Sequence, residues 1–372
     1  MRIAISILSG IGYGGATYFH NLLPALACID THNEYHIFIP KGHPSLSSMA
    51  RPNFRFHESI RQSQSALKRL LWEQFLLPRE LKKWKIDIVF TAKNLNIFLA
   101  PGKTVIAVRN MEPLKYRAYE NDWKLNVISW VKWQLTKWSV LKADYIVATS
   151  QTVQEALRER FPGIENKMSV VYNGNPVENI PSLKAIEERN YEGQPYILTA
   201  SKFVAYANQL NLIKAYARMC AKNQNAPLLL FAGGVHDKKY FAKVKKLIIK
   251  HGIDERIRIL GLVPHHRLIE LMSSATAFVF PSTLEACPHT LIEAMACGVP
   301  IATSKTPPMP EICADAALYF NPRDSQDITE KIEQILADKV TRRRLGSAGL
   351  ARVQFFSWNK TAQQLVKIFT SL

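Results

Sequence analysis

The chain has 372 residues, and 47% of them are hydrophobic, which is ample for a core in each of about two domains. It is strongly basic, with 48 Lys and Arg against 30 Asp and Glu and a formal net charge of +18 at pH 7. No apolar run approaches the roughly 18 residues of a membrane span, so the composition argues against an integral membrane protein and favours anionic partners.

The five cysteines are spread along the chain without a Cys-x-x-Cys pair, and their number is odd. This pattern favours reduced thiols in a reducing compartment and argues against zinc. Residues 1–10 form an apolar run that is short and lacks a cleavage site of small residues. We therefore expect a first buried strand rather than a signal peptide, and a cytoplasmic protein. The cysteines are Cys28, Cys220, Cys287, Cys297 and Cys313.

Short apolar runs alternate with helical segments along both halves of the chain. Strands that alternate with helices imply parallel sheets and right-handed crossovers. We therefore predict an α/β protein of two Rossmann-like, doubly wound domains, linked by the polar residues 176–194. The expected strands are 3–8, 35–39, 86–90, 105–108, 145–148 and 169–172 in the first half, and 196–200, 228–232, 257–260, 277–280, 299–303 and 317–320 in the second.

A glycine-rich turn follows the first expected strand, where residues 10–17 read Gly-Ile-Gly-Tyr-Gly-Gly-Ala-Thr and open a helix that runs to about Ala27. Glycine lets the backbone approach a ligand closely, and a helix start favours phosphate. The turn lacks the full Gly-x-Gly-x-x-Gly fingerprint, and Asp30 is too close to it to bind a ribose as that motif requires. A tight turn needed only for packing explains it equally well.

The positive charge is concentrated in residues 51–142, which hold 18 Lys and Arg against 7 Asp and Glu. Within this range a helix expected over 122–142 mixes aromatic, aliphatic and lysine residues, and the stretch 68–85 repeats this composition. Such helices can lie on an anionic membrane surface, or they can pack on their own domain with snorkelling lysines. No nucleic-acid-binding motif accompanies the charge, so we expect no nucleic acid partner. The residues of the helix are Trp123, Lys124, Val127, Trp130, Val131, Lys132, Leu135, Lys137, Trp138 and Lys142.

Residues 281–300 are the most informative segment, and they read as the end of a strand, a loop, a helix and the start of another strand. Pro288 can occupy the first helical position, and Gly298 suits a left-handed stop after the helix. Glu285 lies in the loop, and Glu293 lies about one turn inside the helix. The unpaired amides of the helix start suit an anion such as a diphosphate, while carboxylates accept hydrogen bonds from the hydroxyl pairs of a sugar or a ribose. Alternatively, Glu293 only favours the helix start and Glu285 is a solvated loop residue. The amides belong to His289, Thr290 and Leu291.

This segment resembles the retaining nucleotide-sugar glycosyltransferases of the large family four, which carry a Glu-x7-Glu signature. Here the signature runs from Glu285 to Glu293, and residues 293–300 continue it as Glu-Ala-Met-Ala-Cys-Gly-Val-Pro. The resemblance implies a GT-B fold, in which two Rossmann-like domains face a central cleft. It also implies that Glu285 faces the donor sugar, that Glu293 holds the ribose hydroxyls, and that neither a metal nor another cofactor is needed.

The diphosphate-binding run of this family usually reads Gly-Arg-x5-Lys-Asn, and the matching residues here are 201–208. By resemblance, Ser201, Lys202 and Asn208 belong to the donor site. Lys202 can replace the usual Arg as a point charge, although it lacks the bidentate fork. Ala207 stands where the family has Lys, so one of two cations is missing.

The resemblance assigns further donor-site residues outside these two runs. Gly14 and Gly15 match a Gly-Gly loop that faces the cleft. Leu262 and Val263 follow the strand 257–260, at the turn that in relatives lies against the nucleotide base.

Arg109 occupies the position at which many relatives have a His that contacts the donor sugar. An arginine stays protonated and cannot be a base. This is compatible with retention in the family, where the leaving phosphate oxygen is thought to assist the acceptor hydroxyl on the same face. We expect Arg109 either to stabilise the departing charge or to form a structural ion pair with an acid such as Glu112.

The sequence thus predicts an acceptor-binding domain of residues 1–176, joined by a C-terminal helix of 356–372, and a donor-binding domain of residues 177–355. The predicted activity is transfer of a sugar from a nucleotide-sugar donor to a saccharide or lipid-linked acceptor, in cell-surface polysaccharide synthesis. The alternatives are a nucleotide-sugar-binding protein with little transfer activity, motivated by Ala207, and an epimerase on a similar fold. A phosphorylase would need a lysine that carries pyridoxal phosphate, and nothing here marks one.

Overall fold

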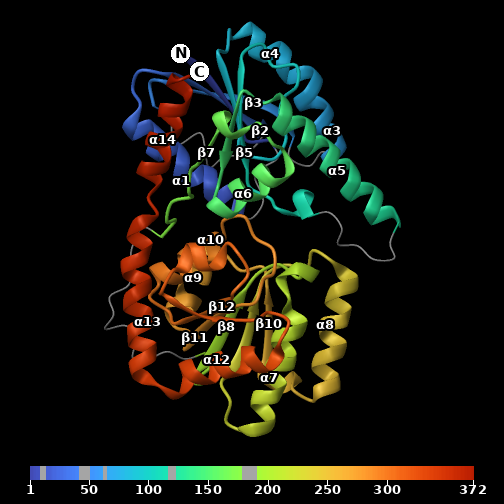
Figure 1. Cartoon of the computed structure of the whole chain (residues 1–372), viewed down its shortest axis with the longest axis vertical. Coiled ribbons are helices and arrows are strands. Elements are labelled where there is room, and N and C mark those ends of the chain that lie inside the picture. Colours follow the sequence, from blue (N-terminus) through green and yellow to red (C-terminus); the bar gives the residue numbers. More distant parts are fainter. Residues whose placement is uncertain (9–13, 42–50, 62–64, 116–122, 178–190) are drawn as a thin grey trace. The chain divides into compact units, whose positions relative to one another are not determined.

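A computed structural model describes residues 1–8, 14–41, 51–61, 65–115, 123–177 and 191–372. The chain divides into two compact units, each built on its own sheet (Figure 1). Unit 1 comprises residues 1–174 and 357–372, and unit 2 comprises residues 175–356. Most of the predicted linker lies outside the described residues.

Unit 1 contains a seven-stranded parallel sheet with the order β3-β2-β1-β4-β5-β6-β7. Helices connect most of these strands, as the alternation in the sequence predicted, whereas the connection from β4 to β5 contains no helix. The strands are β1 (Arg2–Ser6), β2 (Glu34–Lys41), β3 (Phe54–Arg61), β4 (Ile88–Thr91), β5 (Lys103–Val108), β6 (Tyr145–Ala148) and β7 (Met168–Val170). The helical segments are α1 (Gly14–Ile29), α3 (Ala66–Leu71), the π-helical η1 (Trp72–Leu76), α4 (Leu77–Lys83), η2 (Glu112–Lys115), α5 (Trp123–Lys142), α6 (Gln151–Arg160), η3 (Glu165–Lys167) and α14 (Trp358–Thr370).

The C-terminal helix α14 packs on α1, at the other end of the sequence of unit 1 (Figure 1). Trp358 meets Tyr18 edge to face, with 5.3 Å between the ring centroids. Leu365 and Phe369 are fully buried in the same core as Leu22 of α1. Burial of side chains this large contributes on the order of 2 kcal/mol each, which is enough to hold the last helix on the first unit.

Unit 2 contains a six-stranded parallel sheet with the order β10-β9-β8-β11-β12-β13. The predicted fold class of two parallel α/β domains is therefore correct. The strands are β8 (Tyr196–Ala200), β9 (Leu228–Ala232), β10 (Ile257–Gly261), β11 (Ala277–Phe280), β12 (Ile301–Ser304) and β13 (Ala317–Phe320). The helical segments are η5 (Ala205–Ala207), α7 (Gln209–Lys222), α8 (Lys238–His251), η6 (Asp254–Arg256), α9 (His265–Ser273), α10 (His289–Ala296), α11 (Met309–Cys313), α12 (Ser325–Ala337), α13 (Lys339–Arg352) and η7 (Val353–Phe355).

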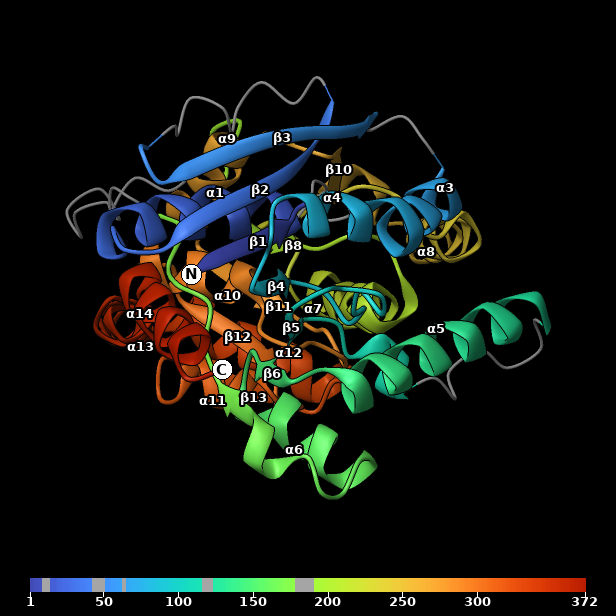
Figure 2. The ribbon, with the colours of Figure 1, turned by 90° about the horizontal axis from the view of Figure 1, so that it is seen from above.

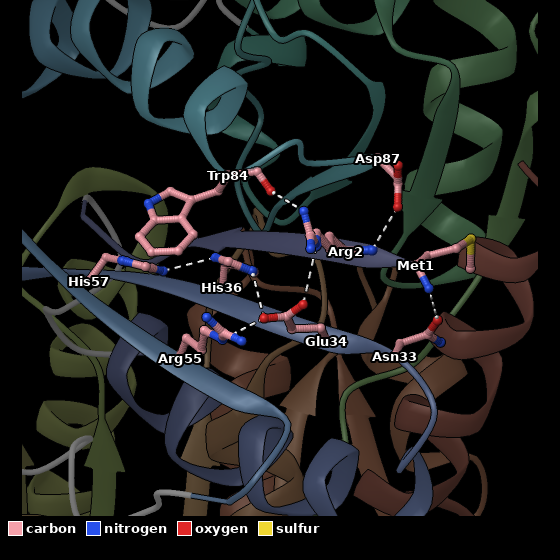
Figure 3. A network of polar contacts seen from close by, with 9 residues as sticks. All are labelled: Met1, Arg2, Asn33, Glu34, His36, Arg55, His57, Trp84 and Asp87. Carbon is pink, nitrogen blue, oxygen red and sulfur yellow. Dashed lines mark hydrogen bonds and ion pairs between the residues drawn. The ribbon is translucent and has the colours of Figure 1, made fainter.

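Strand β3 is the one described strand that the sequence did not predict; it reads Phe-Arg-Phe-His-Glu-Ser-Ile-Arg, and its apolar residues do not form a continuous run like those of the predicted strands. It lies at the edge of the sheet, where polar side chains are tolerated. Its His57 stacks on His36 of β2 with ring centroids 5.0 Å apart, and the His57 Nε2 and His36 Nδ1 atoms are 2.9 Å apart (Figure 3). The Glu34 carboxylate forms an ion pair with the Arg2 guanidinium at 3.2 Å, and its Oε1 lies 3.4 Å from His36 Nε2.

This histidine pair predicts that unit 1 loses stability in mild acid. Burial, followed by the neighbouring His57, lowers the pKa of His36 to about 4, whereas an unfolded chain takes up that proton near pH 6.5. The unfolded state therefore binds more protons between these values, and the free energy of unfolding should fall by roughly 2–3 kcal/mol as the pH drops from about 6.5 to about 4. Urea unfolding at several pH values should show a weaker pH dependence for His36→Gln. The exposed control His251→Gln should keep the wild-type dependence, and equal curves for the two variants would contradict this account.

Candidate functional site

The centre of the sheet in unit 2 brings two loops together. β8 and β11 are neighbours, but the chain continues from β8 toward β9 and from β11 toward β12 on the opposite side. Ligands of doubly wound sheets bind at the carboxyl ends of strands at such a switch point. The loops 201–208 and 281–288 follow these two strands, and they are joined by the Thr283 amide, which donates to the Tyr206 carbonyl at 2.7 Å.

Glu285 lies in the second of these loops and is partly buried. The Ser282 hydroxyl donates to Glu285 Oε1 at 2.8 Å, which orients the carboxyl group. Burial raises the pKa of Glu285 to about 7, and the Ser282 hydrogen bond and the charge of Lys202 limit that rise. Near neutral pH this carboxyl group therefore exists in both its charged and its neutral form, a property that is common in active sites.

Lys202 lies in the loop after β8, and its backbone is fixed from two sides. The side-chain amide of Gln209 donates to the Lys202 carbonyl and to the Ser201 hydroxyl, both at 3.0 Å. Gly233, after β9, packs against this loop with a φ of +154°, and a Cβ there would lie 2.0 Å from the Ser201 carbonyl oxygen. The ammonium group of Lys202 lies 5.4 Å from the ring centroid of Tyr206. The loop thus presents one cation beside Glu285.

Asn208 ends the loop in the left-handed conformation, with a φ of +61°. Its side-chain amide donates to the carbonyls of Pro281 at 3.1 Å and Pro322 at 2.7 Å, and its Oδ1 accepts a bond from Asn211. These bonds tie the two loops and the β13 end together, so Asn208 supports the site from within unit 2. The preceding Ala207 is buried at 2% exposure.

Helix α10 begins at His289, with Pro288 as its N-cap rather than its first helical residue. The prediction of an unpaired Leu291 amide is wrong, because this amide donates to the Pro288 carbonyl at 3.2 Å in a 3₁₀-type bond that tightens the first turn. The amides of His289 and Thr290 belong to the two residues before Leu291, at the start of α10. The predicted left-handed stop is confirmed, since Gly298 has a φ of +61°.

Glu293 is buried in α10, with 6% of its side chain exposed, and its Oε1 lies 2.9 Å from His265 Nε2. The hydrogen bond to Glu293 raises the pKa of His265, which favours the imidazolium form beside this carboxyl group. His265 is the first residue of α9 and comes two positions after Val263, which is partly buried. The pair therefore brings the turn after β10 to α10. The sequence did not identify His265, because nothing in its spacing from Glu293 indicates contact.

The other predicted site residues belong to unit 1. Gly14 and Gly15 are the first residues of α1, and the turn before them falls on residues 9–13, outside the described part of the chain. Arg109 follows β5, and its guanidinium lies 4.0 Å from the ring centroid of Tyr18. Glu112, considered as its ion-pair partner, lies 3.4 Å from the Lys132 ammonium. Arg109 and Glu285 thus belong to different units.

Within the described ranges, no three His, Cys, Asp or Glu side chains are grouped so that they could hold a metal ion. The helices in the same ranges include none with the length and apolar character that crossing a membrane requires.

Two family models match consecutive parts of the chain. The model of Glycosyltransferase Family 4 matches residues 13–179, and that of Glycosyl transferases group 1 matches residues 183–352. The alpha-maltose-1-phosphate synthase of Mycolicibacterium smegmatis is 24% identical over 286 residues, which cover 71% of this chain and 72% of that protein. The O-antigen chain mannosyltransferase B of Escherichia coli is 30% identical over 201 residues, which cover 53% of this chain and 51% of that protein.

Similarity of structure extends over the whole chain. Anabaena Alr3699/HepE, solved in complex with UDP-glucose, matches with a TM-score of 0.74 and 18% identity, over 100% of both chains. The two family models together span most of this chain, and the signature acids, Lys202 and the start of α10 all belong to the unit that the second model matches. The protein therefore belongs to glycosyltransferase family 4 and has the GT-B fold.

Proposed function

We propose that this glycosyltransferase transfers a sugar, with retention and without a metal ion, from a nucleotide-sugar donor to a saccharide or lipid-linked acceptor of a cell-surface polysaccharide. The observation that carries the proposal is the contact network at the centre of the unit 2 sheet. There Glu285 and Lys202 lie on two joined loops, and the second loop leads directly into α10 with Glu293. The similarity to the O-antigen chain mannosyltransferase of Escherichia coli supports the class of product.

Each group in this network suits one part of a nucleotide sugar. The amides of His289 and Thr290 and the ammonium of Lys202 would bind the diphosphate, since a helix start and a cation both favour an anion. Glu285 would accept hydrogen bonds from the sugar hydroxyls and Glu293 from the ribose, with Val263 beside the base. As the bond between the anomeric carbon and the phosphate oxygen breaks, the acceptor oxygen would bond to that carbon on the same face, and its proton would pass to the leaving phosphate oxygen. Arg109 is our candidate for stabilising that developing charge.

A thermal-shift panel of nucleoside diphosphates and nucleotide sugars tests the proposal, because a ligand that binds only the folded state raises the unfolding midpoint. We expect one base to stabilise the protein selectively, and the matching nucleotide sugar to be consumed on addition of an acceptor, with or without EDTA. Selective binding without turnover would instead indicate a binding protein. Conversion of the donor sugar in the absence of any acceptor would indicate an epimerase. Loss of turnover in EDTA would contradict the metal-free mechanism.

Glu293→Gln should lower the affinity for the selected nucleoside diphosphate about tenfold, because hydrogen bonds to a charged acceptor contribute about 1.5–3 kcal/mol. Inorganic pyrophosphate has no ribose, so its affinity should not change. His265→Gln should have a smaller effect, and His251→Gln none. Isothermal titration calorimetry of the wild type and the three variants, with the nucleoside diphosphate and with pyrophosphate, measures these affinities. An equal loss for pyrophosphate would show that Glu293 acts through the shape of α10 and not on the ribose.

A membrane surface is our proposal for a further partner, based on the inverted polarity of α5. This helix buries the small polar side chains of Ser129, Thr136 and Ser139, whereas Trp130 and Trp138 are about half exposed. Helices of soluble proteins normally bury their apolar face and expose the polar one. In Figure 2 α5 lies along the rim of unit 1. Among the α5 side chains that the structure describes, the exposed apolar ones are Val127, Ile128, Trp130, Val131, Trp138 and Leu141.

The protein should bind phosphatidylglycerol-containing vesicles at low salt and bind neutral phosphatidylcholine vesicles much more weakly, because the lysines of α5 favour anionic lipid. Trp130→Ser with Trp138→Ser should weaken vesicle binding about tenfold or more, since each indole would lose its apolar contact. Ile249→Ser removes a side chain of unit 2 that is 71% exposed and serves as the matched control. Co-sedimentation measures the binding. No binding to anionic vesicles, or equal binding of both variants, would contradict the proposal.

A further inference from the structure

A buried charged cluster lies in unit 1, apart from the donor-site residues of unit 2. Glu73 belongs to the π-helical segment η1, and only 1% of its side chain is exposed. It forms an ion pair with the Lys93 ammonium, and the Ser6 hydroxyl donates to its Oε1 at 3.2 Å. π-Helical turns are rare in proteins, and those that occur are often found at functional sites. The buried charges and the π-helical turn together indicate that this cluster takes part in binding a ligand.

The cluster lies where a ligand of unit 1 is expected. Ser6 is the last residue of β1, and Lys93 comes two residues after the end of β4. β1 and β4 are neighbours, while the chain continues from β1 toward β2 and from β4 toward β5 on the opposite side. This is the topological switch point of the first sheet, and its carboxyl edge is the ligand position of a doubly wound fold.

Lys93, and not Glu73, is the member of the cluster that can reach a ligand. Its side chain is 23% exposed, against 1% for Glu73. A buried ion pair contributes little net stability, because desolvation offsets most of the attraction between the charges. A carboxylate at this place does, however, fix the position of an ammonium group that would otherwise move on a flexible stem. Glu73 is thus a positioning residue for Lys93.

A second cation lies at the same edge of the sheet. Asn94, next to Lys93, accepts a hydrogen bond from the Arg109 amide at 2.9 Å, so the loops after β4 and β5 are joined. Glu112, the acid that follows Arg109, lies 3.4 Å from Lys132. Lys93 and Arg109 are both cations at this edge of the sheet, and ammonium and guanidinium groups favour a negatively charged oxygen as the ligand atom.

We propose that Lys93, positioned by Glu73, binds an oxyanion of the acceptor, either a phosphate or a carboxylate. This inference rests on the proposed function, since it names the chemical class of the acceptor. Glu73 and Lys93 keep the anionic group at the switch point of unit 1, and the acceptor hydroxyl that reacts belongs to the same molecule. A neutral saccharide lacks the group that Lys93 binds and is a poorer acceptor.

Isothermal titration of the full chain, saturated with the nucleoside diphosphate that the thermal-shift panel selects, tests this assignment. The saturated nucleotide site of unit 2 cannot then account for binding of the probes. The probes are α-D-mannose 1-phosphate, D-glucuronate and neutral methyl α-D-mannoside, and the first two distinguish a phosphate from a carboxylate. We expect one anionic probe to bind at least about tenfold more tightly than the neutral one. Lys93→Arg should keep this preference, and Lys367→Met, an exposed lysine of α14, should not alter it.

Lys93→Met leaves Glu73 buried without its cation and can fail to fold, so the decisive variant is Glu73→Gln with Lys93→Met, in which both charges are removed. It should bind the anionic probe no better than the neutral one, with nucleotide affinity within twofold of wild type. The proposal is overturned if the double variant keeps the preference, if wild type has none, or if nucleotide affinity falls in parallel. The proposed function fails separately, when no nucleotide or nucleotide sugar stabilises the wild-type protein.

Discussion

Glu285→Gln should lower kcat/KM for sugar transfer by about 100- to 1,000-fold, which corresponds to about 3–4 kcal/mol of lost transition-state stabilisation. Glutamine keeps the size of the side chain and can still accept the Ser282 hydrogen bond, so the fold of the loop should survive. The carboxylate charge is lost, and with it the strong hydrogen bonds to sugar hydroxyls at the moment when positive charge develops on the sugar. Steady-state kinetics with the selected donor measure this effect.

The pH dependence of turnover separates an electrostatic role of Glu285 from a structural one. The pKa of this carboxyl group is raised to about 7, so the charged form increases as the pH rises from 6 to 8. Wild-type kcat/KM should therefore rise through this range, while the residual activity of Glu285→Gln should lose that dependence. Glu330→Gln, an exposed position of α12, should leave both the rate and its pH dependence unchanged. A pH profile that persists in Glu285→Gln would assign the titration to another group.

The parts of the site that the sequence predicted are those set by local order along the chain. Glu285 and Glu293 lie in one continuous strand, loop and helix, and the stop at Gly298 follows from a single residue with a positive φ. The alternation of strands and helices likewise predicted both sheets, apart from the edge strand β3. Local patterns were sufficient there because each feature depends on neighbours within a few residues.

The parts that the sequence missed depend on contacts between distant segments. His265 meets Glu293 only because α9 and α10 pack together, and Glu73 meets Lys93 only because η1 packs on the loop after β4, where Gln74 donates to the Asn96 carbonyl. The sequence separation between the two residues of each pair does not indicate that they are in contact. The Leu291 amide was misjudged for a different reason, since a short helix can close its first turn with a 3₁₀-type bond to its N-cap carbonyl.

Lys202 should carry most of the charge neutralisation of the donor diphosphate, because Ala207 occupies the position of the second cation of the family. Lys202→Met should lower kcat/KM about 100-fold and weaken the nucleoside diphosphate about tenfold, since the cation contributes most when the leaving group gains charge. The corresponding nucleoside, which has no phosphate, should bind with unchanged affinity. Lys202→Arg should retain most of the activity, because the charge is kept and the guanidinium adds a bidentate contact.

The matched control for Lys202 is Lys250→Met, which removes an exposed lysine at the end of α8. It should leave both kinetics and binding unchanged, even though it alters the net charge by the same amount. If the two methionine variants lose affinity equally, the effect belongs to the general positive potential of the protein and not to a contact at the diphosphate. If Lys202→Met loses affinity for the nucleoside as well, the loop 201–208 has moved. Loss of the hydrogen bonds from Gln209 to Ser201 and Lys202 would explain such a movement.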